Sequence, residues 1–281
     1  MTLTQARPAA ETRRARRTAL GWFRDHIVLI AGLLALAYLL IPNVVVVVLS
    51  FNRPAGRFNY TWNEFSLNAW ANPCDVAGMC DALGVSLRIA VLSTLVAAAL
   101  GTLAAFALTR HRFRGRGGTN VLIFFPMATP EVVMGSSLLA LFVNAAIVPL
   151  GFWTILIAHI MFMLSYVIVT VKARLAVLDP RLEEAAMDLY ADERTTFWRV
   201  TFPLALPGIA AASLLAFALS FDDFIITNFN AGSEVTFPMF VWGAAQRGAP
   251  PQVNVIGTMM FIAALAAVLI GQLAGRRGRA R

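Results

Sequence analysis

Long apolar runs, each about as long as a membrane is thick, set the strongest limit on how this chain folds. An α-helix needs about 20 apolar residues to cross a hydrocarbon core of ~30 Å, and six runs of roughly that length occur. They lie at 26–50, 84–109, 120–145, 152–171, 204–227 and 253–274. With 59% hydrophobic and 14% charged residues, the chain is too apolar for a soluble domain. We therefore predict an all-α, polytopic membrane protein with about six transmembrane helices in one domain, 26–274, between basic tails at 1–25 and 275–281.

The basic residues indicate how these helices are oriented. An even number of spans places both termini on the same side, and loops rich in Lys and Arg face the cytoplasm. Nineteen of the 23 Lys and Arg residues fall in the tails and in the loops of that side. They are Arg7, Arg13, Arg14, Arg16, Arg17, Arg24, Arg110, Arg112, Arg114, Arg116, Lys172, Arg174, Arg181, Arg194, Arg199, Arg276, Arg277, Arg279 and Arg281. We expect a multi-pass protein of the cell (inner or plasma) membrane with both termini cytoplasmic, and this topology explains the net charge of +8 without a nucleic-acid partner.

The most charged part of the chain, 179–207, separates the fourth and fifth apolar runs. Asp179 is a good helix N-cap, and Pro180 suits the first helical position. Glu183 and Glu184 then meet the positive end of that helix, and Asp192 can cap a second short helix. The segment predicts two short helices on the cytoplasmic side, although a solvated loop between two membrane helices would carry similar charges.

The spacing within this segment resembles a known motif. Glu184, Ala185 and Ala186 are followed after three residues by Tyr190, and nine residues further on the chain reads VTFP at 200–203. This pattern resembles the EAA loop of permease subunits in binding-protein-dependent ABC importers, here spanning 179–203. The family usually has Gly where this chain has Tyr190. A positive φ at Tyr190 would be strained, and any other φ would reshape the turn between the two short helices.

Other stretches resemble the second (C-type) permease subunit of spermidine/putrescine importers: FNRPAGRFNYTW, RFRGRG, MATPEVVMG, LSFDDF and PPQVNVIGT. The resemblance implies the type I ABC importer permease fold and a complex with a homologous second permease, two copies of an ATPase and an extracytoplasmic solute-binding protein. No phosphate-binding Gly-Lys-Ser/Thr loop occurs, so ATP and Mg²⁺ belong to the ATPase and this chain is expected to bind no cofactor and to catalyse no reaction. The ATPase-coupling residues that the resemblance implies are Glu183, Glu184, Ala185, Ala186, Asp188, Leu189 and Glu193.

Three acids lie in or beside apolar runs, where a carboxylate is costly unless it faces protein, water or a partner cation. They are Glu131, Asp222 and Asp223, and with Ser220 and Trp70 they form the predicted substrate path for an organic cation. Plainer interpretations remain open for each. Glu131 suits an interfacial position, the Asp pair can cap a helix, Ser220 can bond its own helix, and Trp70 can anchor at the membrane interface.

His159, Cys74 and Cys80 are the other residues of the sequence with distinctive chemistry. We interpret His159 as a packed, neutral, hydrogen-bonded histidine rather than a proton relay. Cys74 and Cys80 share one polar loop on the expected outer side, where a small disulfide ring and two free thiols are both compatible with the sequence. No metal-ligand cluster has useful spacing.

The alternatives to a polyamine permease are an ABC permease for another small organic solute and an ion-coupled secondary transporter that works without an ATPase.

Overall fold

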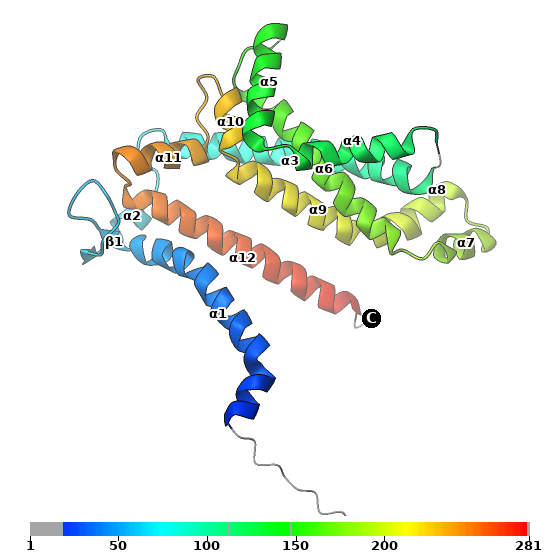
Figure 1. Cartoon of the computed structure of the whole chain (residues 1–281), viewed down its shortest axis with the longest axis horizontal. Helices are drawn as coiled ribbons and strands as arrows, with labels where there is room; N and C mark the ends of the chain where they lie inside the picture. The colour runs from blue at the N-terminus through cyan, green and yellow to red at the C-terminus, as the bar shows by residue number, and fades with distance from the viewer. Residues whose placement is uncertain (1–18, 112, 147, 280–281) are drawn as a thin grey trace, which may run out of the picture.

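The computed structural model describes residues 19–111, 113–146 and 148–279 (Figure 1). Most of the basic tail predicted at 1–25, together with Arg112 and Arg281, lies outside these residues. At the other end, the last helix runs to Arg279, through most of the tail predicted at 275–281.

The described part of the chain is almost entirely helical, which confirms the predicted fold class. The long helices are α1 (Ala19–Leu49), α3 (Met79–Arg110), α4 (Arg116–Ala128), α5 (Glu131–Ala145), α6 (Phe152–Ala176), α9 (Phe202–Asp222) and α12 (Pro251–Arg279). The shorter ones are α2 (Asn68–Ala71), α7 (Arg181–Asp188), α8 (Glu193–Thr196), the π-helix η1 (Phe197–Thr201), α10 (Ile225–Asn230) and α11 (Phe237–Arg247). Two antiparallel strands of two residues each, β1 (Asn52–Arg53) and β2 (Glu64–Phe65), form a hairpin.

Three helices, α3, α6 and α9, pack against one another and form the core (Figure 1). Small residues let them approach closely, as is typical where helices associate within a membrane. A Cβ added at Gly101 of α3 would lie 2.6 Å from Cγ1 of Val167 on α6, so only glycine fits this crossing. Ala97 and Ala212 are also buried here.

The helices α1 and α12 lie side by side, apart from this core (Figure 1). Large apolar side chains are exposed along most of α1, as expected of a surface that faces lipid or another membrane subunit. In the described residues, five helices are long and apolar enough to cross a membrane, and a sixth crossing arises if the bent pair α4–α5 is one span.

Two of the predicted spans are broken. The run 120–145 is divided at Thr129 and Pro130 into α4 and α5, which differ in direction by 104°. Proline lacks an N–H and pushes the preceding residue out of the helical region, and Thr129 accordingly has φ −80° and ψ 131°. The run 204–227 is divided after Asp222, because Asp223 is extended (φ −63°, ψ 122°) before α10 begins. The segments that follow the two breaks, α5 and α10, pack against each other.

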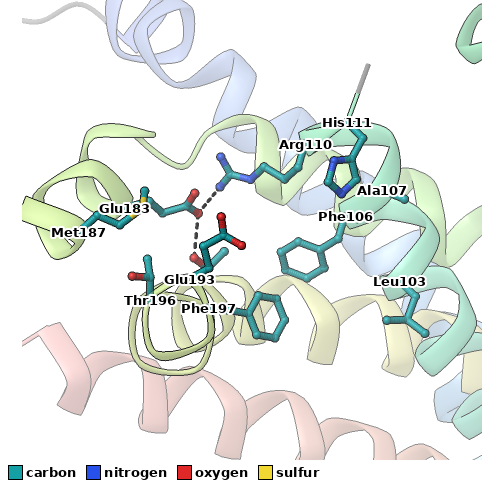
Figure 2. A pocket seen from close by; sticks show the side chains of 11 residues that line it. Leu103, Phe106, Ala107, Arg110, His111, Glu183, Met187, Glu193, Thr196 and Phe197 are labelled. Carbon is teal, nitrogen blue, oxygen red and sulfur yellow. Dashed lines mark hydrogen bonds and ion pairs between the residues drawn. The ribbon is translucent and has the colours of Figure 1, made fainter. Parts of the chain in front are cut away.

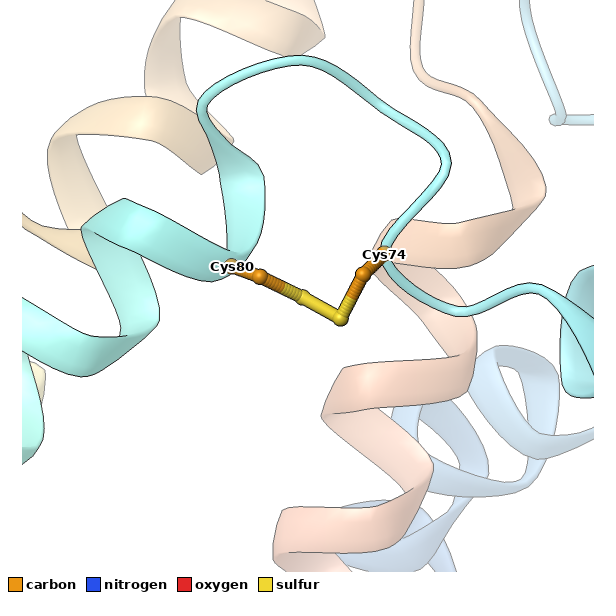
Figure 3. Close-up of a disulfide and its surroundings, with 2 residues drawn as sticks. All are labelled: Cys74 and Cys80. Atoms are coloured by element: carbon orange, nitrogen blue, oxygen red, sulfur yellow. A yellow bond between two sulfur atoms is a disulfide. The ribbon is translucent and has the colours of Figure 1, made fainter.

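Cys74 and Cys80 are joined by a disulfide at the start of α3 (Figure 3). Cys80 lies in the first turn of this helix and Cys74 in the loop before it, so the bond closes a small ring. The ring lies at the end of the molecule that also holds α2, α11 and the hairpin, whereas α7 and α8 lie at the opposite end (Figure 1).

Candidate functional site

A cavity of about 690 Å³ lies where the two broken spans meet, and we call it the acidic cavity. The α4–α5 break brings Glu131 to its wall, and the α9–α10 break brings Asp222 and Asp223. Aromatic rings complete the wall, with Phe162 and Tyr166 from α6 and Phe224 beside the acids. Among the described residues that line it, none is a lysine or arginine. The structure therefore brings together three of the residues predicted for the substrate path, from two broken spans.

The three acids of the cavity have different surroundings. Asp223 is the buried one: its side chain is 5% exposed, and its Oδ2 accepts hydrogen bonds from the N–H and the hydroxyl of Thr227, both at 2.7 Å. Glu131 is exposed at the start of α5, and Asp222 is exposed at the end of α9. Neither Glu131 nor Asp222 has a cationic ion-pair partner in the described part of the chain. These two carboxylates thus carry uncompensated negative charge into the cavity.

A buried polar network lies behind the cavity wall and includes Ser220. The ring of His159, 1% exposed, has Nδ1 2.7 Å from Oγ of Ser220 and Nε2 3.0 Å from Oγ1 of Thr227. The same Nε2 is 3.4 Å from Oδ2 of Asp223, and Ser220 continues the network to Ser93 of α3 at 3.1 Å. The network joins α3, α6 and α9 at the break. Ser220 itself is 4% exposed and does not line the cavity.

Trp70, the remaining residue of the predicted path, is not brought to the cavity. It lies on α2, where its indole Nε1 donates to Oγ of Ser50 at 3.2 Å. Its ring stacks on Phe51 with the ring centroids 5.3 Å apart. These contacts fix the start of the loop after α1.

The predicted coupling loop forms two short helices, α7 and α8, in the places where the sequence indicates caps. Oδ1 of Asp179 accepts from the N–H of Arg181 (3.0 Å), and α7 begins one residue later than Pro180 suggests. Asp192 caps α8 by accepting from the N–H of Thr195 (2.9 Å), and hydrogen bonds from Thr195 hold the pKa of this carboxyl below its usual value. Because the folded-state pKa is lowered, the cap stabilises α8 at neutral pH and loses its effect as the pH falls through that pKa.

Tyr190 adopts the conformation that the sequence marks as strained. Its φ is +62°, and its side chain is fully exposed. The residue ends α7, where its N–H donates to the carbonyl oxygen of Met187 at 3.0 Å. A residue with a Cβ therefore occupies a left-handed position that suits glycine.

Glu183 points into the molecule, unlike most of the predicted coupling residues. It forms an ion pair with Arg110 at the end of α3, and its Oε1 accepts from the hydroxyl of Thr201 at 2.8 Å (Figure 2). These groups border a cavity of about 520 Å³, and Glu193 also lines it. Glu184, Ala185, Asp188, Leu189 and Glu193 are exposed, and Ala186 is half-buried.

Sequence reasoning did not find two of these contacts. The pairing of Arg110 with Glu183 joins residues 73 positions apart, and no local pattern announces it. The contact of His159 with Asp223 is also distant in sequence, and its signal was only a lone histidine in an apolar run.

Comparison with known proteins identifies the family. Residues 97–276 match the family described as the binding-protein-dependent transport system inner membrane component. The chain is 38% identical over 242 residues to the spermidine/putrescine transport system permease protein PotC of Haemophilus influenzae, a match that covers 86% of this chain and 93% of that protein. It is 37% identical over 236 residues to the putrescine transport system permease protein PotI of Escherichia coli, covering 82% and 83%.

A solved structure shows the same fold. The chain matches the structure of a bacterial alginate ABC transporter in complex with an alginate pentasaccharide-bound periplasmic protein, with a TM-score of 0.65 at 15% identity over 92% of this chain and 97% of that one. The two chains therefore share their overall fold. The chain belongs to the inner membrane components of binding-protein-dependent transport systems, and it is a multi-pass permease subunit of an ABC transporter.

Proposed function

We propose that this permease subunit carries polyamines of the spermidine and putrescine class through the membrane as part of an ATP-driven importer. The observation that carries the proposal is the acidic cavity, where Glu131 and Asp222 have no cationic partner in the described residues and aromatic rings lie beside them. Unpaired carboxylates at membrane depth are costly unless a cation meets them. The relatives PotC and PotI are named for the transport of such cations.

The chemistry of the cavity suits a flexible molecule with more than one ammonium group. Glu131 and Asp222 come from different segments, so two ammonium groups of one solute can each meet a carboxylate. The faces of Phe162, Tyr166 and Phe224 add cation–π attraction, which is stronger where water is excluded. Asp223 and Ser220 lie deeper in the same wall, and Trp70 remains a candidate for a contact nearer the outer surface.

The rest of the importer follows from the family. We infer that α7 and α8 face the cytoplasm together with both termini, as the distribution of arginines favours, and that this end contacts one of two ATPase subunits which hold ATP and Mg²⁺. A homologous second permease would cover the exposed apolar helices, and an extracytoplasmic binding protein would deliver the solute at the end that carries the disulfide.

Reconstitution of the whole transporter in proteoliposomes tests this function. Uptake of labelled putrescine or spermidine should require ATP and the binding protein. We expect Asp222→Asn to raise the solute concentration for half-maximal uptake about tenfold, the equivalent of one lost ion pair of ~1.4 kcal/mol. Asp75→Asn is the matched control, because Asp75 is an exposed acid in the disulfide loop, away from the acidic cavity.

Three results would change the proposal. Uptake by this chain without any ATPase would favour an ion-coupled secondary transporter. Uptake of a different solute, with polyamines failing to compete, would keep the ABC permease but change its substrate. Equal effects of Asp222→Asn and Asp75→Asn would remove the acidic cavity from the solute's path.

A further inference from the structure

His159, the buried histidine of α6, lies beside Asp223, and the hydrogen bonds around its ring determine which protons it carries. The hydroxyl of Ser93 donates to the carbonyl oxygen of Ile89 at 2.5 Å, so its single proton is not available to Ser220, 3.1 Å away. Ser220 therefore donates to Ser93. With its own proton used, Oγ of Ser220 can only accept from Nδ1 of His159, at 2.7 Å.

Thr227 limits the other ring nitrogen in the same way. Its hydroxyl donates to Oδ2 of Asp223 at 2.7 Å and must therefore accept from Nε2 of His159, at 3.0 Å. Both ring nitrogens then donate, which only an imidazolium cation can do. The cation has its counter-charge within reach, since Nε2 is 3.4 Å from the carboxylate of Asp223. A cationic His159 differs from the neutral histidine that the sequence suggests.

We propose that His159 is the built-in counter-cation of Asp223. The pair is internally neutral, so Asp223 holds the break between α9 and α10 in place, and the free negative charge of the acidic cavity resides on Asp222 and Glu131. Two adjacent aspartates thus have different tasks. The assignment of Asp222 and Glu131 to a solute rests on the proposed function, whereas the pairing of His159 with Asp223 does not.

The geometry explains why the break needs such a pair. Asp223 accepts the N–H of Thr227 (2.7 Å) and of Ile226 (3.4 Å), so its carboxylate organises the first turn of α10. The contact from His159 joins that turn to α6, and Ser220 joins it to α3. Since Asp222 and Phe224 flank Asp223, a shift at Asp223 would turn both away from the cavity. His159 is therefore a positioning residue, which acts through Asp223.

A set of charge-removing variants in the assembled transporter tests the pairing. His159→Gln keeps a polar side chain but removes the cation, so Asp223 is left buried and unpaired. We expect the unfolding midpoint of the purified complex to fall by at least about 5 °C, together with a loss of maximal uptake. Adding Asp223→Asn should recover more than half of that fall. Asp223→Asn alone should cost less than His159→Gln, because it leaves no buried carboxylate without a counter-charge.

Asp222→Asn is the matched control, since it removes an equal charge one residue away. It should raise the concentration for half-maximal uptake while leaving the midpoint within about 2 °C of the parent. Combined with His159→Gln, it should recover nothing. If Asp223→Asn fails to recover the midpoint of His159→Gln, or if Asp222→Asn recovers it equally well, the pairing is wrong. The midpoint needs no solute, so this result can be read even if polyamines prove not to be the substrate.

Discussion

At the scale of single residues, Tyr190 departs from a family motif and adopts a left-handed backbone conformation that glycine adopts without strain. A left-handed conformation costs a residue with a Cβ about 1–2 kcal/mol, and glycine avoids that cost. Tyr190 has φ +62° with its ring fully exposed, so no contact within the described chain offsets the strain. The ring is instead available to whatever docks on α7 and α8.

We therefore expect Tyr190→Gly to stabilise the turn after α7. The lost backbone entropy of glycine offsets part of the gain, which leaves about 0.5–1 kcal/mol. Hydrogen–deuterium exchange of the amides of residues 189–191 should then slow by about two- to fivefold. Tyr190→Ala is the matched control, because it removes the ring but keeps the Cβ, and it should not slow exchange. Equal protection in both variants would show that the ring, and not the backbone, sets the stability.

At the scale of elements, Glu183 connects three helical segments that move together only if the connection holds. Its carboxylate contacts Arg110 of α3 and Thr201 of η1, which leads directly into α9 (Figure 2). We expect these contacts to transmit a displacement of α7 to α3 and α9, two of the three core helices.

Breaking this ion pair should weaken the link between ATP hydrolysis and transport. We expect Glu183→Gln to lower the amount of solute moved per ATP hydrolysed by about two- to fivefold, because a half-buried pair contributes up to ~1 kcal/mol. Both rates are measured in the same proteoliposomes. The charge-swapped variant, Glu183→Arg with Arg110→Glu, should restore part of the ratio. A ratio that stays normal in Glu183→Gln would mean that α7 is held by its other contacts.

The elements also show what a sequence can and cannot predict. Apolar runs are local, so the apolar helices and the caps at Asp179 and Asp192 were within reach. The sharp turn at Pro130 was only partly signalled, because a proline indicates a kink but not an angle of 104°. The break after Asp222 carries no proline or glycine. Asp223 accepts local hydrogen bonds from the first turn of α10, as the capping interpretation allows, whereas its contact with His159 is tertiary. The pairs Arg110–Glu183 and His159–Asp223 depend on which helices meet, and a single sequence does not contain that information.

At the scale of the whole molecule, the break between α9 and α10, which borders the acidic cavity, lies at one end of α9, and α7 and α8 lie beyond its other end (Figure 1). The helices α3, α6 and α9 are closely packed through Gly101 and buried alanines. Close-packed helices transmit displacement rather than absorb it. Near the coupling end, Arg174 of α6 donates to the carbonyl oxygen of Leu204 (2.8 Å), which ties α6 to the first turn of α9.

This arrangement predicts that damage at the coupling end abolishes transport without damaging the solute site. Glu184 is exposed on α7, where the family resemblance places the ATPase contact. We expect Glu184→Lys to leave the complex assembled, because no described ion pair is lost, and to reduce ATP-driven uptake at least about tenfold by reversing a charge at the docking surface. The amount of solute taken up per ATP hydrolysed in the presence of the binding protein should fall. Asp75→Lys, at an exposed acid of the disulfide loop outside the predicted coupling residues, measures the effect of charge reversal alone. Unchanged uptake in Glu184→Lys would show that the force on this permease enters somewhere other than α7.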